Sequence, residues 1–119
     1  MAELQSIFDA WNEADTEVRR RIVEAVAASD IRYDDVHKKQ PIVGIDAFVD
    51  FLAFFRSRVS DAEMRADGEA EVLPEAARLK FQLLRNGKPF SAGTYMLALD
   101  GHGRISAMYG FIDKAPETP

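Results

Sequence analysis

The stretch that decides the fold is residues 32–55, which read RYDDVHKKQPIVG followed by IDAFVDFLAFF. Its first half places two adjacent carboxylates, Asp34 and Asp35, just before a proline-containing loop, and its second half is dominated by phenylalanine. In the second half the apolar side chains recur with the period of an α-helix and occupy most of its sides. We therefore expect a short strand over 31–34 and, after the loop, a largely enclosed helix over 45–55.

Two helices are expected ahead of this stretch. The first has an apolar face at the spacing i, i+3, i+4 and i+7, formed by Leu4, Ile7, Phe8 and Trp11. Asp15 is a suitable N-cap for the second helix, which should end at Ser29-Asp30. The apolar face of this second helix is expected at Val18, Ile22, Ala25 and Val26. The arginine triplet at 19–21 is expected on its solvated side rather than at a phosphate-binding surface.

Beyond Asp61 the period of the apolar residues changes from helical to alternating. Apolar residues occupy every second position of this stretch, at Ala77, Leu79, Phe81 and Leu83. Asn86-Gly87 follows as a two-residue hairpin signal. A return strand near 90–99 and a last strand near 104–113 complete an antiparallel meander. Pairing across the hairpin places Tyr95 on the wrong face unless one residue is bulged, and Gly93 is the expected position of the bulge.

Both faces of this meander carry apolar side chains. Pairing the last two strands places Tyr95, Leu97 and Met108 on one face, and Met96, Ala98, Tyr109 and Phe111 on the other. One face should pack on the helices, so the second predicts a partner subunit, in the form of a homodimer through the outer sheet face.

Helices followed by an antiparallel meander are the order of an α+β domain. A twisted sheet that curls around the helices forms a cone-shaped barrel whose mouth suits a hydrophobic small molecule. We expect a single domain over 1–119, with a flexible tail over 114–119.

The composition narrows the function classes. The 119 residues are 47% apolar and include no cysteine, so we expect one domain with its own core and without disulfides or thiolate chemistry. The formal net charge of -5 disfavours nucleic acid as a partner. No apolar run approaches the roughly 20 residues that span a bilayer, and the first residues lack a basic export signal. These features predict a cytoplasmic protein without a membrane partner.

Four features, taken in order, connect the chain with a known superfamily. They are Asp35 with Gly44 nine positions later, the run Gln40-Pro41-Ile42-Val43-Gly44 ahead of the aromatic helix, the Asn86-Gly87 hairpin, and the run GRISAM at 103–108. With these features the chain resembles the nuclear-transport-factor-like cone-fold superfamily, which includes SnoaL-like polyketide cyclases and ketosteroid isomerases. The resemblance covers nearly the whole chain and implies the cone fold, a scaffold that hosts many reactions.

The resemblance also implies catalytic roles for three residues. Matched by spacing, the family's general base falls on Asp35, and its two oxyanion-binding positions fall on Trp11 and Tyr95. An indole N–H and a neutral phenol would then replace the tyrosine and the protonated aspartic acid that serve ketosteroid isomerases. The family's aspartate–proline pair is altered to Asp35-Val36. No metal ion or organic cofactor is expected.

Further residues are expected to line the cone around the ligand. They are Tyr33, His37, Phe48, Leu52, Phe55, Leu79, Phe81, Leu97 and Met108. For His37 the alternatives are an acid–base pair with Asp35 and an exposed position in a loop. Asp34, one residue before Asp35, should face solvent. Asp113 is a second candidate acid, by resemblance to the SnoaL-like cyclases.

Two functions follow as alternatives. The first is a cofactor-independent isomerase or cyclase in which Asp35 acts as general base on an apolar carbonyl-containing ring compound, since desolvation among aromatic rings favours such work. The second is a non-catalytic ligand-binding or dimerisation module of the same fold, which the altered donors favour.

Overall fold

The helices come first in the chain and the long strands last. The structure, a computed structural model, describes residues 3–116. The helical elements are η1 (Leu4–Ile7, a 3-10 turn), α1 (Phe8–Asn12), α2 (Thr16–Val26) and α3 (Ile45–Arg58). The strands are β1 (Ala27–Asp35), β2 (Ile42–Val43), β3 (Ala62–Ala66), β4 (Glu71–Val72), β5 (Ala76–Arg85), β6 (Lys88–Leu99) and β7 (Ile105–Lys114). Within the described residues, no helix has the length and apolar character needed to cross a membrane.

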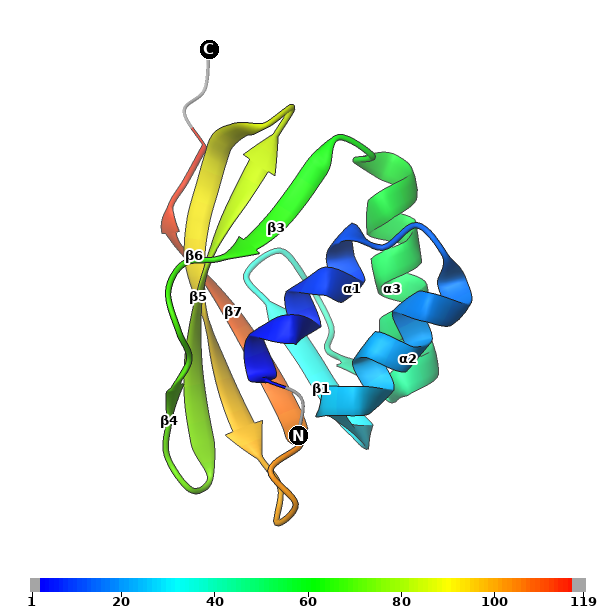
Figure 1. The fold of residues 1–119 in the computed structure, drawn as a ribbon, viewed down its shortest axis with the longest axis vertical. Helices are drawn as coiled ribbons and strands as arrows, with labels where there is room; N and C mark the ends of the chain where they lie inside the picture. The colour runs from blue at the N-terminus through cyan, green and yellow to red at the C-terminus, as the bar shows by residue number, and fades with distance from the viewer. Residues whose placement is uncertain (1–2, 117–119) are drawn as a thin grey trace.

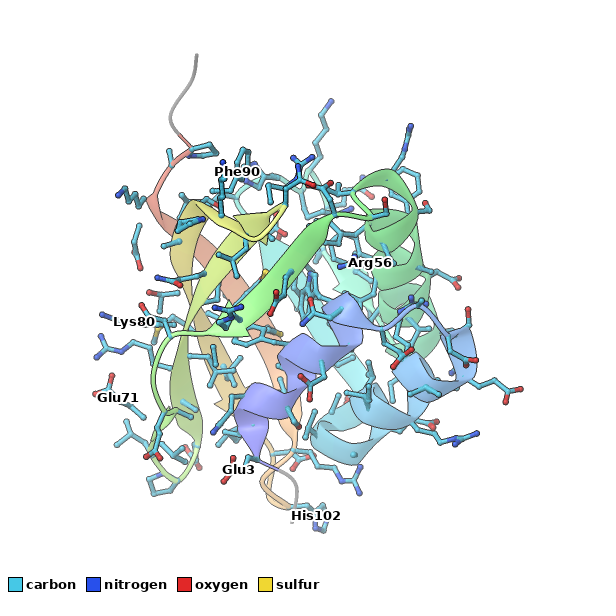
Figure 2. The ribbon with its side chains drawn as sticks, turned by 45° about the horizontal axis from the view of Figure 1, so that its top comes forward. Glu3, Arg56, Glu71, Lys80, Phe90 and His102 are labelled. Carbon is cyan, nitrogen blue, oxygen red and sulfur yellow. The ribbon has the colours of Figure 1, made fainter. Side chains whose placement is uncertain are left out.

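The strands form one curled, mixed sheet with the helices on its concave side, which is the α+β cone predicted from the sequence (Figure 1). The strand order is β2-β1-β7-β6-β5-β3, with β4 beside β5. Phe90 and His102 lie at opposite ends of this sheet (Figure 2). The sheet is not wholly antiparallel as expected, because β1 runs parallel to β7 and no tight turn fixes their relative direction. Strand β7 extends to Lys114, while 117–119 of the expected flexible tail lie outside the described residues.

Helix α2 begins where predicted but buries a different face. The Asp15 side chain accepts hydrogen bonds from the backbone N–H groups of Glu17 (2.9 Å) and Val18 (3.1 Å), which confirms it as the N-cap. The predicted apolar face is wrong in part, because Val18 and Ala25 are exposed. The buried positions of the helix are Arg19, Val23 and Val26. The helix gives way directly to β1, which is longer than the expected strand at 31–34.

Arg19 is a buried charged side chain that ties α2 to α1. It is 1% exposed, and its guanidinium donates to the carbonyl oxygens of Ala10 (3.3 Å) and Glu13. Helix α1 ends at Asn12, and the last carbonyls of a helix have no partner within that helix. The prediction of a solvated triplet at 19–21 is therefore wrong for Arg19, whose hydrogen bonds offset the cost of burying it.

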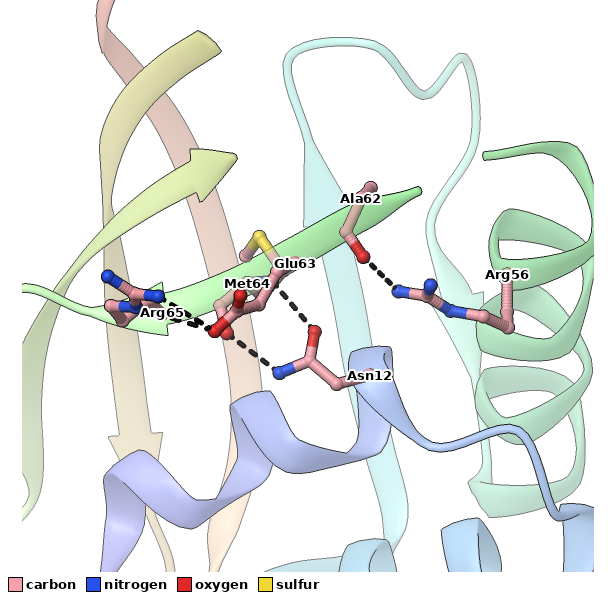
Figure 3. Close-up of polar contacts among 6 residues, drawn as sticks. All are labelled: Asn12, Arg56, Ala62, Glu63, Met64 and Arg65. Carbon is pink, nitrogen blue, oxygen red and sulfur yellow. Dashed lines mark hydrogen bonds and ion pairs between the residues drawn. The ribbon is translucent and has the colours of Figure 1, made fainter. Parts of the chain in front are cut away.

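A second set of polar contacts fixes α1 against β3. The Asn12 side chain donates to the Met64 carbonyl oxygen (2.8 Å) and accepts from the Met64 backbone N–H (2.7 Å), as a neighbouring strand would. Arg56 of α3 donates to the carbonyl oxygens of Trp11 (3.1 Å) and Ala62 (2.5 Å). Asn12 and Arg56 thus reach β3 from two different helices (Figure 3). Together they occupy backbone groups along an edge of the sheet and hold the end of α1 in place.

Helix α3 spans the predicted range but is less enclosed than expected. Gly44, which precedes the helix, has a φ of 94°, a conformation that glycine adopts without strain. The buried face is formed by Phe48, Val49 and Leu52. Phe54 is 59% exposed, so the expectation of a helix covered on most sides is wrong there. The helix has only its inner face against the concave sheet (Figure 1).

The Asn86-Gly87 hairpin forms as predicted, but the accompanying bulge lies elsewhere. Both turn residues have positive φ (52° and 77°), as a type I′ turn requires. The register of β5 and β6 shifts once, and the extra residue is Phe90 rather than Gly93. Gly93 is used instead opposite Phe81, where its missing side chain leaves room for the ring. With this shift Tyr95 shares the concave face with Phe81.

Replacing Arg19 by Met should lower the free energy of unfolding by about 3 kcal/mol, because the buried carbonyl oxygen of Ala10 and the partly buried one of Glu13 would lose their partners. Arg21 lies two positions away with 74% of its side chain exposed, so Arg21→Met is the matched control. That control should change stability by less than about 0.5 kcal/mol. Urea unfolding followed by circular dichroism measures both. Equal effects of the two substitutions would contradict a capping role for Arg19.

Candidate functional site

A cavity of about 600 Å³ opens between the helices and the concave face of the sheet. Helices α1 and α3 form one wall, and strands β1, β3, β5, β6 and β7 form the other. The residues that line it are mainly aromatic and aliphatic, with a few polar side chains among them. A cavity of this size and lining suits an apolar small molecule.

The structure brings most of the predicted site residues together at this cavity. Its wall includes Trp11, Tyr33, Asp35, His37, Phe55, Phe81 and Tyr95. The remaining predicted residues do not line the cavity and belong to the buried core: Phe48, Leu52, Leu79, Leu97 and Met108. They pack against one another where helices and sheet converge, which leaves no space for a ligand there. For the residues at the wall, contact with a ligand stays a prediction.

Other wall residues were missed by the sequence prediction. Phe51 lies four residues before Phe55 on the same face of α3, so the helical spacing could have identified it. Leu83 follows Phe81 by two positions, the spacing of one strand face. The rest are Val36, Met64, Phe90, Ser91, Gly110, Phe111, Ile112, Ala115 and Pro116. Most of these lie at strand ends or in loops, where the sequence pattern does not fix the direction of a side chain.

Three oxygen-bearing side chains form a hydrogen-bonded chain on the cavity wall. The Tyr33 hydroxyl donates to Oδ2 of Asp35 at 2.7 Å and lies 2.9 Å from the Tyr95 hydroxyl. The other carboxylate oxygen of Asp35, Oδ1, accepts from the backbone N–H of His37 at 2.8 Å. Tyr33 and Asp35 are two residues apart on β1, so their side chains lie on the same face. The half-buried carboxylate is thus held by one hydroxyl and one amide.

The surroundings of the two tyrosines favour their neutral forms. Burial raises the pKa of the Tyr33 hydroxyl well above its usual range, and the neighbouring Tyr95 and Asp35 raise it further. Burial also raises the pKa of Tyr95, although its hydrogen bond to Tyr33 acts in the opposite direction. Both side chains therefore keep their hydroxyl protons at neutral pH, which makes them available as hydrogen-bond donors.

The indole of Trp11 completes the wall on the helix side. Its ring centroid lies 6.0 Å from that of Tyr33 and 5.9 Å from that of Tyr95. Trp11 is 3% exposed, and its carbonyl oxygen accepts a hydrogen bond from Arg56. An indole N–H only donates hydrogen bonds, so Trp11 can offer a ligand one donor and no acceptor.

Gly110 lies between Asp35 and Tyr95 and lets the two side chains approach each other. On β7, Gly110 is the cross-strand partner of Asp35 on one side and of Tyr95 on the other. A β-carbon at this position would lie 2.6 Å from Cε1 of Tyr95 and 3.1 Å from Cβ of Asp35. Any side chain at position 110 would therefore stand between the two groups. This role of Gly110 becomes visible only from the register of β1, β7 and β6, and not from the sequence around it.

The histidines contribute little to the polar part of the site. His37 is exposed in a loop, which was the second of its two predicted positions. It contacts Asp35 through its backbone N–H. His102 lies in the turn at the opposite end of the sheet from Phe90 (Figure 2). Within residues 3–116, no three side chains of the His, Asp or Glu type converge in a way that could hold a metal ion.

The two other carboxylates considered from the sequence lie outside the cavity wall. Asp34 lies opposite Tyr109 of β7 on the face of β1 away from the cavity, as expected, and is half-buried rather than fully exposed. Asp113 is exposed and accepts a hydrogen bond from the Thr94 hydroxyl at 2.5 Å. Among the described wall residues Asp35 is therefore the one carboxylate.

Comparison with solved structures identifies the fold. A presumed isomerase of the SnoaL-like family from Agrobacterium tumefaciens str. C58 is 26% identical, with a TM-score of 0.82 and 92% of each chain covered. A presumed ketosteroid isomerase from Kribbella flavida is 19% identical (TM-score 0.70, covering 96% of this chain and 77% of that one). A presumed SnoaL-like polyketide cyclase from Jannaschia sp. CCS1 is 18% identical (TM-score 0.70, covering 93% and 87%). No family model and no curated protein matches the chain. These likenesses confirm the predicted nuclear-transport-factor-like cone fold.

Adding one methyl group at position 110 should separate Asp35 from Tyr95. Gly110→Ala should lower the free energy of unfolding by about 1–3 kcal/mol, because the Tyr95 ring must move to admit the β-carbon. Gly101→Ala is the control, since nothing lies within 4 Å of the β-carbon it would add. Chemical denaturation measures the stability, and the NMR shifts of the Tyr95 ring report its displacement. A Gly110→Ala variant as stable as the control would contradict this account of the site.

Proposed function

We propose that this chain, which has the cone fold of the nuclear-transport-factor-like superfamily, binds an apolar ring compound with a carbonyl group and uses Asp35 to move a proton on it. The observation that carries the proposal is the half-buried Asp35 carboxylate, held by the Tyr33 hydroxyl at 2.7 Å in the wall of a mainly apolar cavity. A carboxylate in such surroundings is a candidate general base, because few water molecules compete for its lone pairs. The reaction class is isomerisation or cyclisation without a cofactor.

The proposed step breaks a C–H bond next to the carbonyl group of the ligand. Asp35 accepts the proton, and the electron pair of the C–H bond moves toward the carbonyl oxygen to give an enolate. Trp11 and Tyr95 are the donors that stabilise this oxygen. Where a C=C bond adjoins the deprotonated carbon, the product is a dienolate, and return of the proton to its far carbon moves the double bond and gives an isomer. Attack of the enolate carbon on a second carbonyl group instead closes a ring, after which Asp35 returns its proton to the new alkoxide.

A non-catalytic ligand-binding function is the second candidate. It is favoured by the donor set, because an indole N–H is a weaker donor than a phenol. In addition, the Tyr95 hydroxyl already lies 2.9 Å from that of Tyr33 and shares its hydrogen bonding with that neighbour. In this case Asp35 orients a ligand by accepting a hydrogen bond and transfers no proton.

We also propose that a second copy of the chain covers the outer face of the sheet. Met96 and Tyr109 lie on this face of β6 and β7 and are 42% and 38% exposed, and Phe111, which shares the face but also reaches the cavity rim, is 50% exposed. Exposed apolar side chains that adjoin one another commonly mark a protein interface.

We further propose that the protein is located in the cytoplasm, because a chain without cysteine suits a reducing compartment.

A panel of steroid, terpenoid and aromatic polyketide ketones should include compounds that raise the melting temperature, because a ligand of the native state alone stabilises it. Leu83→Trp should abolish this shift by filling the cavity. Val72→Trp, at a position that is 60% exposed on β4, is the matched control and should keep it. Thermal-shift assays measure both, and silence across the whole panel would contradict ligand binding of this kind.

For any compound that binds, the Asp35→Asn variant separates the two candidate functions. If Asp35 transfers the proton, the variant should retain binding and lose turnover by at least about 100-fold. Turnover is followed by the ultraviolet absorbance of the rearranged ketone. A ligand that the native chain binds without any conversion supports the binding module instead.

Met96→Glu should disrupt the proposed dimer, because it would bury an unpaired charge in the interface. Sedimentation equilibrium should give twice the chain mass of 13.3 kDa for the native protein and the single mass for the variant. Val72→Glu, at an exposed position on β4, should leave the dimer intact. A native protein that sediments as a monomer at micromolar concentration would refute this part of the proposal.

A further inference from the structure

The hydrogen-bonded chain of Asp35, Tyr33 and Tyr95 has a direction that its number of protons determines. With Asp35 ionised, two hydroxyl protons serve two links, the one between Tyr33 and Asp35 (2.7 Å) and the one between the two tyrosines (2.9 Å). A carboxylate only accepts, so Tyr33 donates to Asp35 and Tyr95 donates to Tyr33. The Tyr95 oxygen then has only lone pairs to offer a third partner.

A proton on Oδ2 of Asp35 reverses the order. The carboxylic acid then donates to Tyr33, Tyr33 donates to Tyr95, and the Tyr95 proton becomes free for a ligand. Tyr33 is 1% exposed, so a hydroxyl proton that pointed away from both neighbours would be buried without a partner. The second carboxylate oxygen does not enter the chain, because it accepts from the His37 backbone N–H.

The neighbouring charges do not interrupt this chain. The Lys38 ammonium lies 5.0 Å from the centre of the Phe51 ring, and Asp34 is on the other face of β1. Burial raises the pKa of both Tyr33 and Tyr95, so both phenolic protons are present at neutral pH. In the proposed reaction the proton that is gained and lost is therefore the one on Asp35.

We propose that the protonation of Asp35 switches Tyr95 between hydrogen-bond acceptor and hydrogen-bond donor toward the ligand, with Tyr33 as the positioning residue that transmits the change. The inference rests on the proposed function, because it needs a ligand beside Tyr95 in the cavity. It specifies what each state recognises. An ionised Asp35 selects a hydroxyl or N–H group at Tyr95, and a protonated Asp35 selects a carbonyl or enolate oxygen.

The switch supplies a donor at the moment when the proposed reaction needs one. As Oδ2 of Asp35 takes the proton from carbon and the electron pair moves to the carbonyl oxygen, the new acid O–H turns toward Tyr33, and the O–H bonds of Tyr33 and Tyr95 rotate without breaking. Tyr95 then donates to the developing enolate, whereas the ketone before proton transfer has only the Trp11 donor. An interaction that is made in the transition state and not in the ground state raises the rate rather than the affinity.

The Asp35→Asn variant tests the switch, because its amide oxygen can accept from His37 while its amide nitrogen donates to Tyr33. Two bicyclic probes of similar size report the direction: indole has only a donor, and 1-indanone has only an acceptor. Calorimetry should show that the substitution shifts the ratio of their dissociation constants by about tenfold in favour of 1-indanone. In a Tyr33→Phe background the same substitution should leave that ratio unchanged, because the link is cut.

A second measurement needs no ligand. The chain has three tyrosines, so labelling their Cζ atoms with carbon-13 gives three signals, with the exposed Tyr109 as an internal reference. Asp35→Asn should move the Tyr95 signal when Tyr33 is present and leave it in place in the Tyr33→Phe background. A Tyr95 signal that ignores the substitution, or that responds equally without Tyr33, overturns the switch. If the signal responds as expected while neither probe binds, the coupling of Asp35 to Tyr95 through Tyr33 stands, and the proposed binding of a ring compound beside Tyr95 fails.

Discussion

The absence of a side chain at position 110 is the constraint on which the site depends. Strand β7 separates β1 from β6, and Gly110 is the cross-strand partner of both Asp35 and Tyr95. Alternate strands of a sheet lie roughly 10 Å apart, a distance that two side chains can bridge only if nothing stands on the strand between them. With Gly110 in that place, Tyr33 can lie within hydrogen-bond distance of both groups. A backbone feature thus creates the polar cluster, and the cavity surrounds it.

The opposite wall of the cavity depends on helix ends rather than on helix propensity. Helix α1 has five residues, too few for a stable helix in isolation, yet it carries Trp11 into the wall. Its carbonyl groups are satisfied by two arginines from other helices, Arg19 from inside the core and Arg56 from beside β3. Each guanidinium has several donors in a fixed geometry and can bond more than one carbonyl oxygen. The position of the Trp11 ring therefore follows from polar contacts made elsewhere.

The fold could be predicted from the sequence because its signals are local, whereas the site depends on distant pairings. The Asp15 cap and the Asn86-Gly87 turn each act within a few residues and were predicted correctly, and the helical periods located the helices although they assigned part of the buried face of α2 wrongly. The parallel pairing of β1 with β7, and hence the role of Gly110, has no local signal. Helix α3 gives the sharpest case, since Phe48 fills the core and Phe51 lines the cavity although both are apolar residues of one helix. Residue type cannot tell which phenylalanine packs in the core and which lines the cavity. That depends on how far the curled sheet lies from the helix beside each residue.

Tyr33 changes how the donors of this site should be compared with those of the ketosteroid isomerases. Judged one by one, an indole and a phenol are weaker than the donors they replace, and this counts against an enzyme. The Tyr95 hydroxyl is not an independent donor, however, because Tyr33 connects it to the carboxylate that would receive the proton. Hydrogen bonds in such a network strengthen or weaken together. The donor strength available at this cavity is therefore a property of three linked oxygens, and the substitution of any single donor is a poor measure of it.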